Sequence, residues 1–125
     1  MIRKALLSTV LIATVCLASG ITYNSVPSSP GAGEIFASGE IQPGKLDVPG
    51  QIFLYASPVT GDAGQGGWVE CTKEEVGGKI KWSGTINSNL TSGKDYKVIA
   101  VLRYKTVGAP GNKAAYTKAV PVKVK

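Results

Sequence analysis

The segment from Leu90 to Arg103 (LTSGKDYKVIAVLR) constrains the fold of this chain more than any other. Successive side chains of a β-strand point to opposite faces, so residues of one parity share a face. The even positions from 96 to 102 are apolar, and a turn containing Gly93, which tolerates a positive φ, precedes them. The segment therefore predicts a strand with a fixed start and one face in a core, formed by Leu90, Tyr96, Val98, Ala100 and Leu102.

Short stretches of strand character, separated by turns rich in Gly, Pro and Asn, make up the rest of the chain after residue 33. Apolar residues do not recur there at helical spacing. The expected strands cover residues 34–42, 45–48, 51–56, 68–72, 79–86, 96–106 and 114–125. These features predict an all-β domain, an antiparallel two-sheet sandwich of about seven strands.

The N-terminal 20 residues have the composition of a secretory signal peptide. Arg3 and Lys4 precede an apolar run over 5–17, and small residues follow. A transmembrane anchor is the alternative, but the run is shorter than the roughly 20 residues that a spanning helix needs. The polar residues 21–33 then predict a flexible linker, which leaves 34–125 as the sandwich domain. We therefore expect an exported protein, located in the periplasm, at the cell surface or outside the cell.

The two cysteines cannot form a disulfide framework in the mature chain, because Cys16 lies in the predicted signal peptide. Lipidation of Cys16 is an alternative, although the residues before it match a lipoprotein signal poorly. We expect membrane contact only through the signal peptide or such a lipid. Cys71 is expected to be a small buried residue, with a disulfide-linked dimer as the alternative.

Positive charge is concentrated in the C-terminal part of the chain. Residues 94–125 contain eight basic residues and one acid, whereas residues 21–93 contain four basic residues and seven acids. In an exported protein such a surface favours an anionic glycan or another envelope component as partner, and nucleic acid is not expected. The alternative is that these lysines only solubilise outward faces and edge strands.

The arrangement of Leu90, Tyr96, Val98 and Ala100 resembles the L-x-P-x-T-x-Y-x-V-x-A stretch of fibronectin type III domains. A pattern found in bacterial exported immunoglobulin-like domains is also similar, and it adds Gly78, Trp82, Ile86 and Gly93. The resemblance covers residues 78–124 and departs at Ser92, where fibronectin domains favour proline. It implies a fibronectin type III-like sandwich with a tyrosine corner, in which Leu90 fills the core and the Tyr96 hydroxyl bonds to the backbone upstream.

The usual residues of catalytic and metal sites are scarce in this chain. It contains no histidine, which is the commonest general base and metal ligand. Glu74 and Glu75 are adjacent, so a strand would turn them to opposite faces. We therefore expect no enzymatic activity, no catalytic residues, no metal site and no cofactor.

Two groups of side chains are candidates for a binding surface. Ile99 and Val101 fall on the outward parity of their strand, between Lys97 and Arg103, where they would contact a partner or lie under a covering loop. Tyr55, which shares a face with Phe53, and Trp68 are candidate aromatic platforms for sugar rings, although Trp68 could instead be a core residue.

The expected function is that of a non-enzymatic exported module, structural or interacting, at the cell envelope, with a protein or an envelope polysaccharide as partner. One alternative is a small carbohydrate-binding module for anionic or neutral glycans. The second alternative is an inhibitor of a hydrolase that acts through the exposed glycine-rich loop at 58–67.

Overall fold

The computed structural model describes residues 18–61 and 65–125. These residues contain nine strands and no α-helix, so the prediction of an all-β fold is confirmed with more strands than expected. The strands are β1 (Gly20–Ser28), β2 (Ile35–Gln42), β3 (Asp47–Pro58), β4 (Gly67–Glu70), β5 (Thr72–Val76), β6 (Lys79–Ile86), β7 (Asp95–Thr106), β8 (Lys113–Tyr116) and β9 (Val120–Lys123).

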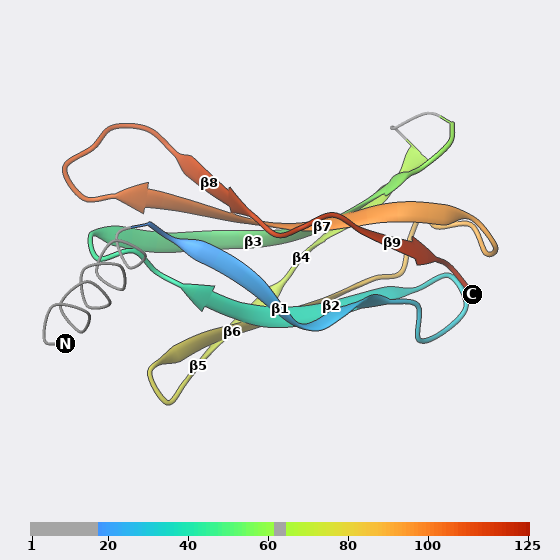
Figure 1. The fold of residues 1–125 in the computed structure, drawn as a ribbon, viewed down its shortest axis with the longest axis horizontal. Coiled ribbons are helices and arrows are strands. Elements are labelled where there is room, and N and C mark those ends of the chain that lie inside the picture. The colour runs from blue at the N-terminus through green and yellow to red at the C-terminus, as the bar shows by residue number, and fades with distance from the viewer. Residues whose placement is uncertain (1–17, 62–64) are drawn as a thin grey trace, which may run out of the picture.

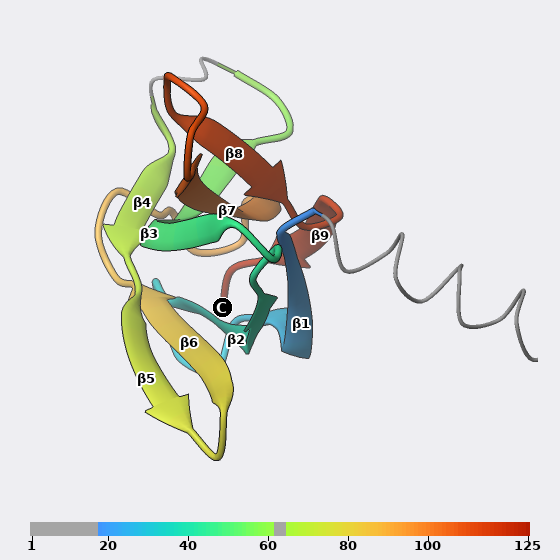
Figure 2. The ribbon, with the colours of Figure 1, turned by 90° about the vertical axis from the view of Figure 1, so that its left-hand side faces the viewer.

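The strands form two antiparallel sheets that face each other, as Figures 1 and 2 show. The first sheet has the order β1-β2-β6-β5. The second sheet has the order β4-β3-β7-β8, and β9 also pairs with β7. The inner faces of both sheets contribute to a single cluster of buried apolar residues, which is the packing expected of a β-sandwich.

Strand β7 is central to the second sheet, because it pairs with β3 on one side and with both β8 and β9 on the other. Its even-numbered side chains Tyr96, Val98, Ala100 and Leu102 are all buried, as the alternation in the sequence predicts. Trp82 on β6 of the first sheet belongs to the same buried cluster and is 2% exposed. The predicted core face of the segment after Leu90 is therefore confirmed.

The side chain of Tyr96 closes the turn that precedes β7. Its hydroxyl accepts a hydrogen bond from the backbone N–H of Thr91 at 2.9 Å, while the ring is fully buried. Leu90 is half-buried and packs against the core. The turn is also bonded to the C-terminal end of the chain, because the N–H of Gly93 donates to the carbonyl of Val124 at 2.7 Å. The start of β7 is thus fixed by contacts on both sides of the turn.

The prediction of a flexible linker over 21–33 is wrong for most of that segment. Gly20–Ser28 forms β1, an edge strand of the first sheet that pairs with β2 through two register shifts. Ile21 is 5% exposed, and the ring of Tyr23 packs against Trp82 with centroids 6.0 Å apart. This segment has the composition of a linker, but its pairing with β2 and these two contacts hold it in the sheet.

The fold begins before the expected end of the signal peptide. The hydroxyl of Ser19 donates to the Asp47 carboxylate at 2.6 Å and accepts from the N–H of Gly44 at 3.0 Å. Thr106 donates to the other oxygen of Asp47 at 2.6 Å, and these two hydrogen bonds, with that from Ser19 the larger, lower the pKa of this carboxyl. Residues 1–17 lie outside the described residues, so the signal peptide and lipidation at Cys16 stay predictions.

Residues 73–76 and 49–50, which lie between expected strands, are parts of strands. Thr72–Val76 forms β5, although all five of its residues are exposed, because it pairs with β6 along its whole length. Pro49 and Gly50 were expected to end a strand, but β3 continues through them with a register shift against β7. A Cβ at Gly50 would lie 2.8 Å from the carbonyl oxygen of Arg103, so the shift depends on close approach of the two backbones.

The expected single strand over 114–125 is two strands, β8 and β9, separated at residues 117–119. Thr117 occupies the gap and is buried. Its Oγ1 accepts the backbone N–H of Ala100 at 2.8 Å and donates to the Tyr23 hydroxyl at 2.7 Å. That hydroxyl donates to the carbonyl of Lys118 at 3.1 Å. Ala100 pairs with Leu54 of β3 on one side, and on the other side, where neither β8 nor β9 pairs with it, the side chain of Thr117 supplies the acceptor for its N–H.

Cys71 is buried in the core, as expected from the sequence. Burial, with a smaller contribution from the negative charge of Glu70, raises the pKa of its thiol to about 12. The thiol is therefore protonated at neutral pH and is a poor nucleophile.

Candidate binding surface on the second sheet

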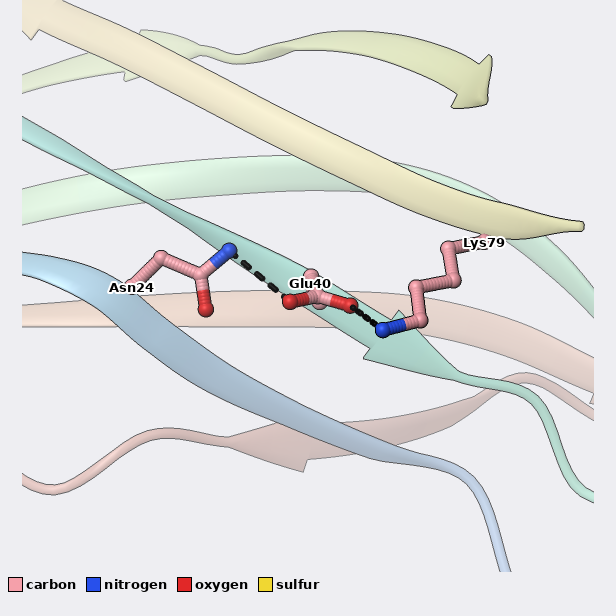
Figure 3. A network of polar contacts seen from close by, with 3 residues as sticks. All are labelled: Asn24, Glu40 and Lys79. Atoms are coloured by element: carbon pink, nitrogen blue, oxygen red, sulfur yellow. Dashed lines mark hydrogen bonds and ion pairs between the residues drawn. The ribbon is translucent and has the colours of Figure 1, made fainter. Parts of the chain in front are cut away.

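The solvent face of the first sheet is mainly polar apart from Phe36 and Val76, as is usual for an antiparallel sheet with one face in water. Asn24 on β1 donates to Glu40 on β2 at 2.9 Å, and Lys79 on β6 pairs with the same carboxylate at 3.7 Å (Figure 3). The hydrogen bond from Asn24, and to a lesser degree the nearby lysines, lower the pKa of Glu40. Glu74 of β5 lies opposite Lys81 of β6. Opposite charges thus alternate across this face.

The solvent face of the second sheet is different, because aromatic and aliphatic side chains are aligned across its strands. The register places Trp68 of β4, Tyr55 of β3 and Ile99 of β7 side by side. In the neighbouring row, Val101 of β7 lies between Phe53 of β3 and Tyr116 of β8. We call these residues the aromatic face: Phe53, Tyr55, Trp68, Ile99, Val101 and Tyr116.

The aromatic rings of this face are accessible to solvent. Trp68 is 60% exposed, Tyr116 is 63% exposed and Tyr55 is 38% exposed. Phe53 packs edge-on against Trp68, with ring centroids 5.9 Å apart, and lies 6.1 Å from the ring of Tyr55. The alternative that Trp68 is a core residue, and not a platform, is therefore wrong. The three neighbouring rings hold one another in place, so the surface is organised before any ligand arrives.

Ile99 and Val101 lie at the bottom of an open depression on this face, with a volume of about 520 Å³. Phe53 and Tyr55 line it on the β3 side, and Tyr116 lines it on the β8 side. Both aliphatic side chains are only half-buried. They can therefore be reached from solvent. No loop among the described residues covers them, which was the alternative.

Positive charges flank the aromatic face along β7. Lys97 precedes Ile99, and Arg103 and Lys105 follow Val101 on the same parity, all three exposed. The ion pairs among the described residues are Lys79–Glu40 and Lys123–Asp95, so none of these three cations takes part in one. The acids on this face are Glu70 of β4, opposite Phe53, and Asp95 of β7, which shares the parity of Lys97 and pairs with Lys123. The surface thus combines an apolar centre with positive ends.

The structure brings the candidate residues of both groups onto one surface. Lys97, Ile99, Val101 and Arg103 come from β7, and Tyr55 and Trp68 from the two strands beside it. Tyr116 was missed by the sequence analysis. In a single strand over 114–125, Tyr116 would share the inward parity of Val120, Val122 and Val124. The interruption at 117–119 turns it outward instead.

The described residues contain no group of three or more His, Cys, Asp or Glu side chains that could hold a metal ion. They also contain no helix long and apolar enough to cross a membrane.

The fold and this surface define a class of protein: an antiparallel two-sheet β-sandwich with an exposed aromatic surface on one sheet. No protein-family model matches the chain, and a search of the curated proteins gave no significant match.

Proposed function

We propose that the protein is a non-enzymatic interaction module, exported to the cell envelope, that binds its partner through the aromatic face. One observation carries this proposal: the solvent faces of the two sheets differ in kind. The first sheet shows paired charges to water, whereas the second shows Trp68, Tyr55 and Tyr116. Clusters of exposed aromatic residues are costly in a soluble protein, and they are typical of surfaces that bind a partner.

We further infer that the sandwich is of the immunoglobulin-like, fibronectin type III-like kind. The order β1-β2-β6-β5 corresponds to strands A-B-E-D of immunoglobulin domains, and β3, β7 and β8 correspond to C, F and G. The hydrogen bond between Tyr96 and Thr91 at the start of β7 has the geometry of a tyrosine corner. This assignment concerns the fold and carries no activity, because such sandwiches host many functions.

Export of the chain is supported by the basic and apolar composition of residues 1–17. The periplasm, the cell surface and the extracellular space are all compatible with this composition. The hydrolase-inhibitor alternative stays a prediction, because residues 62–64 of its loop lie outside the described residues.

The proposal is tested by the binding of the labelled, exported protein to isolated cell envelopes of the species that encodes it. The double variant Trp68→Ala with Tyr55→Ala should lose most of this binding, because it removes two exposed rings of the surface. Phe36→Ala is the matched control, since Phe36 is an outward, half-buried aromatic residue of β2 on the other sheet. Equal binding by the wild type and the double variant would refute the proposal.

A further inference from the structure

The shape of the depression on the aromatic face selects for a slender ligand. Its sides, β3 and β8, are separated by two interstrand spacings, or about 9.6 Å between strand axes. An α-helix with its side chains is about 10–12 Å wide and is too thick to lie at the bottom. The depression follows β7, so a narrow, extended polymer could lie along it over Ile99 and Val101.

An extended peptide is a poor candidate for this position. Such peptides usually bind by adding a strand to a free sheet edge, where backbone groups are unpaired. Here β7 is an interior strand, and β3, β8 and β9 already pair with it on both sides. A ligand above β7 must therefore bind through side chains alone.

The side chains around the depression match the chemistry of a sugar chain. The C–H faces of a sugar ring pack on aromatic rings, and its hydroxyl groups need polar partners at the rim. The rings of Tyr55 and Tyr116 offer apolar faces with a hydroxyl at the end, and Ser57 and Asn112 supply further polar groups beside them. An apolar centre with a few polar groups is the usual composition of a selective ligand site.

The charges select among sugar chains. Arg103 lines the depression at one end, and its planar guanidinium can bind a carboxylate through two parallel hydrogen bonds. Lys97 lies six residues before it on the same parity of β7, about 20 Å away along the strand. A neutral ligand would form no ion pair with either cation. A second copy of this chain, stacked face to face, would bring together two surfaces on which cations outnumber acids, which disfavours a homodimer through this face.

We propose that the ligand of the aromatic face is an acidic polysaccharide, a chain of sugar rings that carry carboxylate groups. This inference rests on the proposed function and names the partner of the same surface. The rings of the polymer pack on Tyr55 and Tyr116 above Ile99 and Val101, and its carboxylates pair with Arg103 and Lys97.

The test compares polysaccharides that share a backbone and differ in charge. The exported protein is titrated with polygalacturonate and with its methyl ester, and with carboxymethylcellulose and hydroxyethylcellulose. Tryptophan emission and affinity electrophoresis report binding. Emission is informative because Trp68 is 60% exposed, whereas Trp82 is 2% exposed and should not respond. At least one acidic polymer should bind on the order of tenfold more tightly than its neutral counterpart.

Variants separate the contribution of charge from that of the rings. Arg103→Gln should weaken binding of the acidic polymer by about tenfold and leave binding of the neutral polymer unchanged. Tyr116→Ala should weaken both, because it removes a ring that both polymers contact. Lys81→Gln is the matched control, since Lys81 is an exposed cation on the first sheet and should have no effect.

Several outcomes would overturn this inference. Equal affinity for the acidic and neutral polymers would remove the role of charge. Equal affinity for polyglutamate, which lacks sugar rings, or for single-stranded oligothymidylate would mean that the surface binds polyanions or nucleic acid instead. If no polysaccharide binds while envelope binding still depends on Trp68 and Tyr55, the inference fails and the proposed function stands. If envelope binding does not depend on them, both fail.

Discussion

Replacement of Thr117 by valine isolates the contribution of one buried hydroxyl to the stability of the sandwich. Valine has nearly the same shape, so the change removes the hydroxyl and leaves the packing intact. The backbone N–H of Ala100, which is fully buried, then loses the acceptor that lies 2.8 Å away. A buried donor without a partner costs about 1–3 kcal/mol, so we expect the free energy of unfolding to fall by about 2 kcal/mol.

Urea unfolding followed by tryptophan fluorescence measures this loss of free energy. In thermal unfolding, Tm should fall by roughly 8–16 °C in a domain of this size. Thr85→Val is the control, because Thr85 is half-buried on the outer face of β6 and should shift stability by less than about 0.5 kcal/mol. A double-mutant cycle with Tyr23→Phe should give a coupling energy of at least about 0.5 kcal/mol, because the two hydroxyls bond directly. Equal stabilities of the Thr117→Val and Thr85→Val variants would refute this reasoning.

Three further predictions follow from the core and the turn before β7. Tyr96→Phe should lower the free energy of unfolding, measured in urea, by about 1 kcal/mol. The loss is small because water can replace the hydroxyl as acceptor for the N–H of the exposed Thr91. An unchanged urea midpoint would mean that this hydroxyl does not contribute to stability. Gly39→Ala should cost more than about 3 kcal/mol in thermal unfolding, since its Cβ would lie against a backbone oxygen of β1 and the indole of β6, whereas Gly20→Ala, with open space around its Cβ, should be nearly neutral. Stability should fall as the pH rises above about 8.5, where the thiol of Cys71 ionises in the unfolded chain but stays protonated in the fold, with its pKa of about 12. Urea titrations at pH 8 and pH 10 should show a smaller fall for Cys71→Ala, in which Tyr23, whose pKa burial also raises, still contributes.

The sequence was sufficient to predict the strands whose own residues alternate in polarity. Strand β7 and strand β6 were placed correctly because their buried apolar residues share a parity and turns precede them. Strands β1 and β5 could not be placed, because few of their side chains are apolar and buried. Their strand conformation results from hydrogen bonding to β2 and β6, and that long-range pairing leaves no local signal in the sequence.

The candidate surface, like the strands, was predictable from the sequence only in part. The outward position of Ile99 and Val101 follows from parity alone, but parity cannot tell which strands are neighbours. The alignment of Tyr55 with both Trp68 and Ile99 depends on the pairing of β3 with β4 and β7. Tyr116 depends on a break in the last strand that the sequence does not mark, since Thr117 forms the break through a buried hydrogen bond.

The contacts of Ser19 determine where this domain can be shortened. A recombinant chain that begins at Ile21, the boundary suggested by composition, would lack the hydroxyl that bonds both Asp47 and the N–H of Gly44. It would also lose the pairing of Gly20 with Gln42 at the first position of β1. A chain that begins at Ser19 keeps both hydrogen bonds of the hydroxyl and the pairing of Gly20. Removal of a leader after Ala18 would therefore leave the sandwich whole, whereas removal two residues later would loosen the edge of its first sheet.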